Sequence, residues 1–173
     1  MPQPPELKRN VELKAQLDDV ERARRVALAL GAEPGGFERQ LDTYFHVSHG
    51  RLKLREIEGK PAVLIWYRRP DARDTRRSDY TLVAVSEPDR MKQALAAALG
   101  VRTTVEKRRE LFFYRNVRIH LDQVTGRGTF LEFEAVLKPD QPEEEGHELL
   151  RELRGRFGVG DADLIEGSYG DVG

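Results

Sequence analysis

Charged side chains at every second position are the feature of this sequence that could do chemistry. Glu12 and Lys14 stand two residues apart in an otherwise largely apolar segment, and Glu132 and Glu134 repeat that spacing near the other end of the chain. Side chains in a β-strand alternate between its two faces, so residues two apart point the same way. Each segment therefore predicts a strand with one apolar face and one face of ionisable groups.

Basic residues follow the same alternating pattern elsewhere. Such rows are Arg51, Lys53 and Arg55; Tyr67 and Arg69; Arg76, Ser78 and Tyr80; Lys107 and Arg109; and Arg118, His120 and Asp122. An antiparallel sheet with one side in water shows similar alternation, so a solvated face is an alternative interpretation. The separation of the charges by sign favours one concave face that carries a basic wall and a carboxylate cluster.

A basic wall beside a carboxylate cluster suits the binding of a metal and a triphosphate together. Guanidinium and ammonium groups donate charge-assisted hydrogen bonds to phosphate oxygens. Carboxylates repel phosphate, but they hold Mg²⁺ or Mn²⁺, hard cations that bridge to phosphate and lower the charge that develops in phosphoryl or nucleotidyl transfer. We therefore expect metal-dependent chemistry on a polyphosphate ligand.

Eight strands and three helices are expected to position these groups. The strands are predicted at residues 9–17, 37–47, 51–58, 61–69, 77–85, 102–114, 117–124 and 128–138. The helices are predicted at residues 20–30, 87–99 and 141–157. Residues 33–36 are predicted to form a turn, and residues 163–172 to add a short strand. This order is typical of an α+β fold with a largely antiparallel sheet that is closed or strongly curved.

Composition limits the class of protein. The chain has 173 residues, enough for one domain, and no cysteine, which excludes thiol catalysis, a cysteine zinc site and disulfides. Its 29 basic and 30 acidic residues nearly cancel, which argues against a general nucleic-acid binder. No apolar run is long enough for a membrane span, and the first residues lack the hydrophobic core of a signal peptide. We expect one soluble, cytoplasmic domain over residues 1–173, with residues 1–8 as a flexible N-terminal extension and neither nucleic acid nor membrane as a partner.

A series of short motifs resembles the CYTH superfamily, and within it the class IV adenylyl cyclase-like branch. The motifs are Val11-Glu12-Leu13-Lys14, Asp42-Thr43-Tyr44-Phe45, Gly50-Arg51-Leu52-Lys53-Leu54-Arg55, Leu64-Ile65-Trp66-Tyr67-Arg68-Arg69-Pro70-Asp71, Arg76-Arg77-Ser78-Asp79-Tyr80, Lys107-Arg108-Arg109, Ile119-His120-Leu121-Asp122 and Phe130-Leu131-Glu132-Phe133-Glu134. Each motif is weak alone, but their order and spacing over nearly the whole chain are specific.

The resemblance implies the triphosphate tunnel fold, a closed eight-stranded antiparallel β-barrel with charged side chains inside and helices packed outside. The metal ligands that it implies are Glu12, Glu132 and Glu134, with Asp122 as a further ligand or a group behind the ligands. The side chains that it implies for triphosphate binding are Lys14, Lys53, Arg55, Arg69, Arg76, Lys107, Arg109 and Arg118. Lys14, Arg69 and Arg76 are the expected catalytic residues. His120 shares a face with Arg118 and Asp122, which places it to line the tunnel, and a structural hydrogen bond and a catalytic role are the two alternatives for it.

The reaction is less constrained than the fold. Members of the superfamily include adenylyl cyclases, thiamine triphosphatases and inorganic triphosphatases, so the fold alone does not decide the activity. Asn10 stands where the family motif has a first glutamate. The lost negative charge predicts weaker binding of a second divalent ion and weaker activation of water, whereas a cyclase takes its nucleophile from the ribose of its own substrate.

Three functions follow from this sequence. Similarity to the subgroup favours a class IV cyclase-like enzyme that uses Mg²⁺ or Mn²⁺ to convert ATP to cyclic AMP and pyrophosphate. A triphosphatase acting on inorganic tripolyphosphate or thiamine triphosphate is the second hypothesis. A non-catalytic module that binds a polyphosphate or nucleotide is the third. In each case the partner is a small-molecule triphosphate, and the chain is expected to be a monomer or a homodimer.

Overall fold

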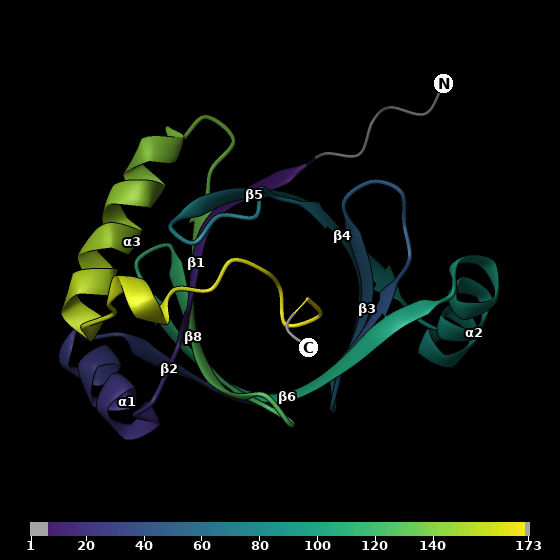
Figure 1. Cartoon of the computed structure of the whole chain (residues 1–173), viewed down its shortest axis with the longest axis horizontal. Coiled ribbons are helices and arrows are strands. Elements are labelled where there is room, and N and C mark those ends of the chain that lie inside the picture. Colours follow the sequence, from purple (N-terminus) through teal and green to yellow (C-terminus); the bar gives the residue numbers. More distant parts are fainter. Residues whose placement is uncertain (1–6, 172–173) are drawn as a thin grey trace.

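Eight antiparallel strands close into a barrel in the computed structural model, which describes residues 7–171 (Figure 1). The strands are β1 (Lys8–Gln16), β2 (Glu33–Phe45), β3 (Arg51–Ile57), β4 (Ala62–Arg68), β5 (Arg76–Val85), β6 (Val101–Tyr114), β7 (Val117–Val124) and β8 (Gly128–Leu137). Their order around the barrel is β1-β5-β4-β3-β2-β6-β7-β8. The fold class predicted from the sequence, a closed eight-stranded antiparallel barrel with helices outside, is confirmed.

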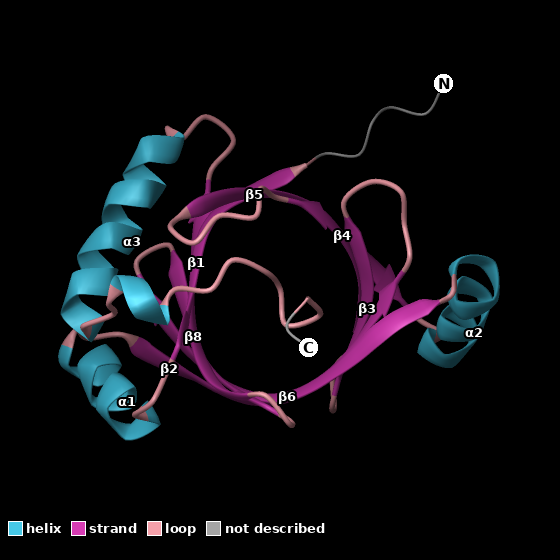
Figure 2. Ribbon diagram, in the orientation of Figure 1, coloured by secondary structure: helices cyan, strands magenta, loops and turns pink. Residues whose placement is uncertain are grey.

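Three helices lie on the outside of the barrel (Figure 2). They are α1 (Val20–Ala29), α2 (Pro88–Leu99) and α3 (Glu143–Phe157). The Asp19 side chain caps α1 by accepting a hydrogen bond of 2.8 Å from the backbone N–H of Arg22. Gly158 ends α3 in the left-handed conformation that glycine adopts without steric cost. Among the residues described, no helix is long and apolar enough to cross a membrane.

The largest hydrophobic cluster lies between the barrel wall and the helices, and a smaller cluster that contains Tyr44, Tyr67, Tyr80 and Tyr169 lies inside the barrel. Helices α1 and α3 cover β1, β7 and β8, while α2 covers β2 and β3 on the other side (Figure 2). Fully buried members of the largest apolar cluster include Val11, Leu13, Ile119, Phe133, Leu150 and Leu153. Because side chains alternate along a strand, burying the apolar face against helices turns the charged face into the barrel.

The prediction of a turn at residues 33–36 is wrong, because β2 already begins at Glu33. The first residues of β2 pair with the last residues of the long strand β6, and the register shifts between Pro34 and Gly36. A β-bulge accommodates proline and glycine in a strand that has a long hydrogen-bonding partner. The turn residues therefore bend β2 instead of ending it.

The chain ends differ from the sequence-based expectation in one respect. The short strand predicted at residues 163–172 is reduced to an isolated bridge between Ala15 and Leu164, after a short 3₁₀ helix at Asp161–Asp163. Val172 lies outside the described residues. Most of the predicted N-terminal extension also lies outside them, but Lys8 already belongs to β1. Beyond Leu164 the chain runs across one mouth of the barrel (Figure 1).

Candidate functional site

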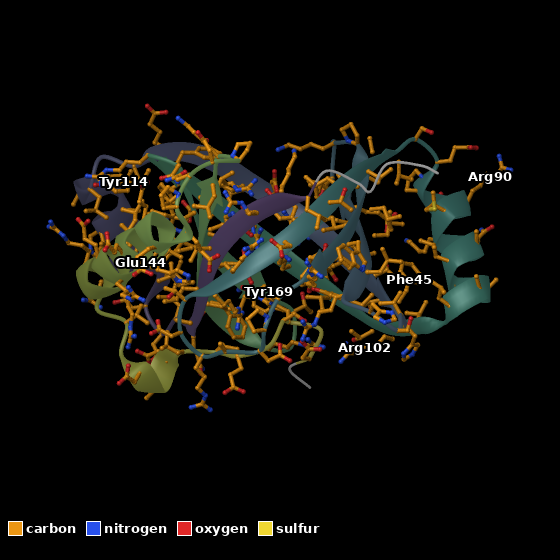
Figure 3. The ribbon with its side chains drawn as sticks, turned by 90° about the horizontal axis from the view of Figure 1, so that it is seen from above. Phe45, Arg90, Arg102, Tyr114, Glu144 and Tyr169 are labelled. Carbon is orange, nitrogen blue, oxygen red and sulfur yellow. The ribbon has the colours of Figure 1, made fainter. Side chains whose placement is uncertain are left out.

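The inward faces of the strands enclose a cavity of about 280 Å³. The predicted site residues that line it are Glu12, Lys14, Lys53, Arg55, Arg69, Lys107, Arg109, Arg118, Glu132 and Glu134. Arg76 and Asp122 are buried but do not line it. Tyr169 lies in the central part of the molecule (Figure 3), where it contacts Lys14 and Asp122. The alternation seen in the sequence therefore brings most of the predicted groups into one space.

Two carboxylates and one imidazole form the candidate metal site, here called the carboxylate–imidazole cluster. His120 on β7 pairs in register with Glu132 on β8, and Glu134 is the next inward residue of β8. One ligand atom from each of these residues lies within 4.8 Å of the others. The Nδ1 atom of His120 is 3.7 Å from Glu132 Oε2 and is buried without a hydrogen-bond partner among residues 7–171. An unpartnered ring nitrogen beside two carboxylates is a donor set that fits a divalent cation.

Glu12 lies on β1 next to β8, directly opposite Glu134 in the strand register, but it is not part of that cluster. Its carboxylate accepts a hydrogen bond from Arg69 and forms a 3.4 Å ion pair with the Nε of Arg76. The predicted metal ligand Glu12 is thus paired with two of the predicted triphosphate ligands. Asn10, the next inward residue of β1, has a buried side-chain oxygen with no hydrogen-bond partner in the described part of the chain.

A second carboxylate, Asp42 on β2, is surrounded by three cations. The Nε and Nη2 atoms of Arg55 each donate a hydrogen bond of 2.7 Å to the Asp42 carboxylate, and the ammonium groups of Lys53 and Lys107 each lie 3.1 Å from it. Asp42 is fully buried and does not line the cavity. Burial alone would raise the pKa of Asp42, but the charges of Arg55, Lys107 and Lys53 hold it well below its usual value. Asp42 therefore stays ionised and fixes three cations of the wall from behind.

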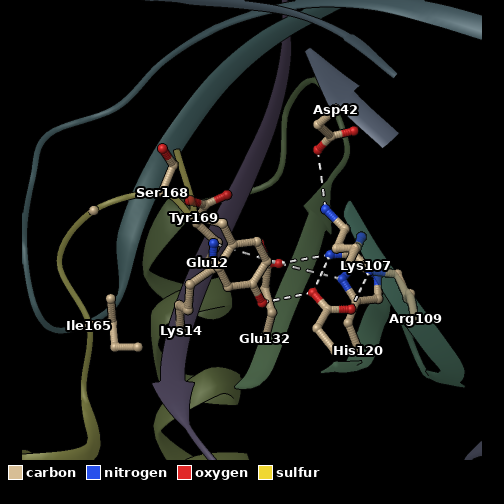
Figure 4. A network of polar contacts seen from close by, with 12 residues as sticks. Glu12, Lys14, Asp42, Lys107, Arg109, His120, Glu132, Ile165, Ser168 and Tyr169 are labelled. Carbon is tan, nitrogen blue, oxygen red and sulfur yellow. Dashed lines mark hydrogen bonds and ion pairs between the residues drawn. The ribbon is translucent and has the colours of Figure 1, made fainter. Parts of the chain in front are cut away.

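Asp122 on β7 plays the same structural part for a different arginine. Arg109 donates two hydrogen bonds of 2.7 Å to its carboxylate, and the Tyr169 hydroxyl donates a third, also of 2.7 Å. Arg109 also reaches Glu132 at 3.1 Å (Figure 4). Asp122 thus lies behind Arg109 and Tyr169, which line the cavity together with the carboxylate–imidazole cluster.

Residues 164–171, here called the C-terminal segment, cover one end of the cavity. The backbone N–H of Ile165 donates to the Lys14 carbonyl at 2.9 Å. Ser168 and Tyr169 line the inner cavity, whereas Gly167 and Asp171 line a second, outer cavity together with Arg51 and other residues. The segment is thus a partition at this end of the barrel (Figure 1).

Arg76 holds the C-terminal segment in place. Its guanidinium donates to the backbone carbonyls of Ala72 (2.6 Å), Ile165 (3.3 Å), Gly167 (3.4 Å) and Glu166. With Glu12 as a further partner, all these contacts are with the chain itself. The structure therefore brings Arg76 to the segment and to Glu12, and not to the cavity surface.

The family model of the CYTH domain matches residues 8–169. The chain belongs to the CYTH domain family. Its barrel is the triphosphate-tunnel fold of that family, as the resemblance in the sequence implied. Among curated proteins, none matches the chain.

Solved structures of other proteins share this CYTH fold. The PH1012 protein from Pyrococcus horikoshii OT3 is 25% identical, with 94% of this chain and 98% of that chain covered and a TM-score of 0.84. A protein from Vibrio parahaemolyticus described as a candidate adenylate cyclase is 21% identical, with 94% and 96% covered and a TM-score of 0.78. A candidate adenylyl cyclase from Hippeastrum, described as having a dominant triphosphatase activity, is 12% identical, with 95% and 93% covered and a TM-score of 0.64.

Burial and close charges set the protonation of the CYTH cavity. Burial lowers the pKa of Lys14 to about 8, even though Glu132 lies nearby and acts in the opposite direction. Burial would raise the pKa of Glu132, but Lys14, His120 and Arg109 together hold it well below its usual value. The pKa of Glu134 is also lowered, by His120 and Arg118, against the effect of burial. Both carboxylates of the cluster are therefore ionised at neutral pH.

Sequence reasoning gave no role to Asp42 or Tyr169 of this CYTH site, and it left the role of His120 open. Asp42 belongs to a quoted motif, but no role was predicted for it; its position two residues before Tyr44 on a strand face was the available signal. Tyr169 gave no strand pattern, because the C-terminal segment is not a strand. His120 lines the cavity, and its role there stays a prediction.

Proposed function

We propose that this chain is a divalent-metal-dependent enzyme that binds a nucleoside triphosphate in its cavity and converts ATP to cyclic AMP and pyrophosphate, as a class IV adenylyl cyclase does. One observation carries the proposal: the carboxylate–imidazole cluster and a set of buried cations face the same enclosed space. Carboxylates and cations on one cavity wall suit a metal-bound triphosphate better than either ligand alone.

Glu132, Glu134 and His120 are the proposed holders of Mg²⁺ or Mn²⁺. Support comes from the ionised carboxylates and from the unpartnered Nδ1 of His120 among the described residues. The side-chain oxygen of Asn10, which has no hydrogen-bond partner within residues 7–171, is a neutral candidate metal ligand on the neighbouring strand. The bound ion would neutralise phosphate oxygens and the charge that develops on them in the transition state.

The proposed triphosphate ligands are Lys14, Lys53, Arg55, Arg69, Lys107, Arg109 and Arg118. The Nε atoms of Arg69 and Arg118 are buried without hydrogen-bond partners among residues 7–171, which leaves them available to phosphate oxygens. For Arg76 and Asp122, whose contacts are with the chain, we propose the roles of holding the C-terminal segment and of orienting Arg109. Of the three catalytic residues expected from the resemblance, Lys14 and Arg69 stay in that role.

The proposed reaction needs no nucleophile from the protein. The 3′-oxygen of the ribose forms a bond to the α-phosphorus, and the bond from that phosphorus to the bridging oxygen of the β-phosphate breaks. Pyrophosphate leaves with the electron pair, and the proton of the hydroxyl passes to solvent. The cations hold the phosphate chain so that attack and departure are in line, which is mainly positioning and electrostatic stabilisation.

A triphosphatase is the second candidate function. It is supported by the shared fold with the Hippeastrum protein, whose description names a dominant triphosphatase activity. In that case water would attack the terminal phosphorus, and phosphate would be released instead of pyrophosphate. Asn10 weighs against this candidate, because one fewer carboxylate is present to orient water.

Product analysis decides between these reactions. The purified protein is incubated with ATP, tripolyphosphate or thiamine triphosphate, in Mg²⁺ or in Mn²⁺, and cyclic AMP, pyrophosphate and phosphate are measured. Cyclic AMP and pyrophosphate in equal amounts are expected from ATP. Phosphate without cyclic AMP would support the triphosphatase instead. Thermal stabilisation by a triphosphate without any product would show a binding module and end the enzymatic proposal.

A further inference from the structure

The two ends of the cavity differ in chemistry along four of its strands. On β3, β4, β5 and β6, the inward residues change from aliphatic at one end to cationic at the other. The aliphatic residues are Ile57, Val63, Ile65, Leu82 and Leu111, here called the aliphatic mouth, and all line the cavity. In the register of the sheet, Ile65 lies beside both Lys53 and Leu82, so this surface is continuous with the cationic wall.

The aliphatic mouth is turned towards the cavity, although the largest hydrophobic cluster of the protein lies outside the barrel. Leu82 is 44% exposed, and the other four residues are half-buried. Ile65 packs against the ring cluster that contains Tyr67 and Tyr80, which also line the cavity. Apolar surface left in contact with water is unfavourable, by about 25 cal/mol per Å², so an apolar ligand group would be stabilised there.

The remaining rim of the same end is polar. Glu38 and Gln40 lie on β2, between the strands that carry Ile57 and Leu111, and Gln40 pairs with Ile57 in the sheet register. Asn10 lies on β1 next to β5, and all three polar residues line the cavity. A ligand group that fits both sides has an apolar face and hydrogen-bonding edges. A nucleobase has this combination, and an inorganic phosphate chain does not.

The opposite end of the cavity restricts how such a ligand can enter. The C-terminal segment lies there, with Ser168 and Tyr169 only 3% and 2% exposed. Lys14 stacks on the Tyr169 ring, with its Nζ 3.8 Å from the ring centroid. A triphosphate that enters past the aliphatic mouth therefore enters with its phosphate chain first. In the bound state the phosphates lie near Lys14 and the organic group lies at the aliphatic mouth.

We propose that the aliphatic mouth binds the base of a nucleoside triphosphate and so selects nucleoside triphosphates over inorganic tripolyphosphate. This inference rests on the proposed function, because it assumes that the cationic wall holds the phosphates. It adds a specificity site on β3 to β6 that is separate from the metal and phosphate ligands.

The test compares the binding of ATP and of tripolyphosphate, each with Mn²⁺, by isothermal titration calorimetry of the full chain. The variant is Leu82→Ser, and the control is Val83→Ser, the adjacent residue of β5, which is 51% exposed and does not line the cavity. Leu82→Ser is expected to weaken ATP binding about tenfold, from the loss of one apolar contact, and to leave tripolyphosphate binding unchanged. Val83→Ser is expected to change neither.

Each other outcome has a distinct meaning. If Leu82→Ser weakens the binding of both ligands equally, or weakens neither, the aliphatic mouth does not bind the base. The proposed triphosphate site would be unaffected by that result. Thiamine triphosphate is titrated in parallel, and an effect of Leu82→Ser on its binding but not on that of ATP would overturn the assignment to a nucleobase. Failure of the wild-type protein to bind any triphosphate would overturn the proposed function itself, and the mouth with it. Thermal unfolding of both variants checks that they are folded.

Discussion

Two sets of buried carboxylates in this barrel differ in what satisfies them. Asp42 and Asp122 each accept two hydrogen bonds from one arginine, through its Nε and Nη2 atoms, and further hydrogen bonds from other donors. Neither carboxylate lines the cavity. Glu132 and Glu134 face the cavity beside His120, whose Nδ1 has no hydrogen-bond partner in the part of the chain described. Carboxylates paired fully with the chain hold the cations in position, whereas those left partly unpaired are available to a ligand. The following experiments test that distinction.

The largest effect on activity is expected from Glu134→Ala. Loss of a metal ligand should reduce metal-dependent turnover by more than about 100-fold, since even groups behind metal ligands contribute 10- to 100-fold. Stability should change little, because the Arg118 side chain left behind is 37% exposed and can be hydrated. Turnover assays and thermal unfolding measure the two quantities. Glu144→Ala, which removes an exposed glutamate of α3, is the control. Full activity in Glu134→Ala would contradict the role of Glu134 as a metal ligand.

The largest effect on stability is expected from Asp42→Asn. The change leaves Lys53, Arg55 and Lys107 without their shared counter-charge, and breaking a buried ion pair costs about 3 kcal/mol or more of unfolding free energy. Urea denaturation measures it, with the exposed Asp140→Asn as control. A loss no larger than that of the control would mean that Asp42 does not hold the wall together.

Asp42 should also contribute to acid unfolding. Its folded-state pKa lies well below the ordinary value of 3.8, so its stabilising contribution is present above about pH 4 and is lost as the pH falls below that value. The difference in unfolding free energy between the wild type and Asp42→Asn should therefore shrink from pH 7 towards pH 2. Denaturation curves across this range measure it. A constant difference would contradict the lowered pKa.

Asn10→Glu sharpens the comparison by adding a carboxylate to the set that faces the cavity. The variant should bind Mn²⁺ several-fold more tightly, because negative charge and ligand number set the affinity for hard cations. If hydrolysis is latent, release of phosphate from tripolyphosphate should also rise. Asn10→Gln, which has the same length as glutamate but no charge, is the matched control. Unchanged metal affinity in Asn10→Glu would mean that position 10 does not contribute to the ion site.

The smallest effect is expected from Tyr169→Phe. The ring and its contact with Lys14 remain, but Asp122 loses one of its three donors, which costs about 1 kcal/mol. For a chain of this length the melting temperature should fall by about 2 to 4 °C. Differential scanning calorimetry measures the shift. Tyr114→Phe, a half-buried tyrosine of β6, serves as control, and equal shifts in the two variants would contradict a special role for the Tyr169 hydroxyl.

The strands and most of the cavity-facing residues could be predicted from the sequence. Alternation of apolar and charged residues fixes which side chains share a face. Because the apolar face is buried against helices, the charged face points into the barrel. Glu132, Lys53 and Arg109 line the cavity for this reason. The start of β2 could not be predicted, because the long partner strand β6 overrides the local preference of Pro34 and Gly36 for a turn.

The sequence by itself determined the barrel, the charged interior and the types of group available for a metal and a triphosphate. Only the tertiary structure decided which of these groups satisfy one another. Arg76 and Asp122 share the alternating pattern of their neighbours, yet the C-terminal segment engages both through Gly167, Tyr169 and neighbouring residues. The physical reason is that a strand pattern is a local property, whereas the partner of a buried charge depends on which distant segment packs against it.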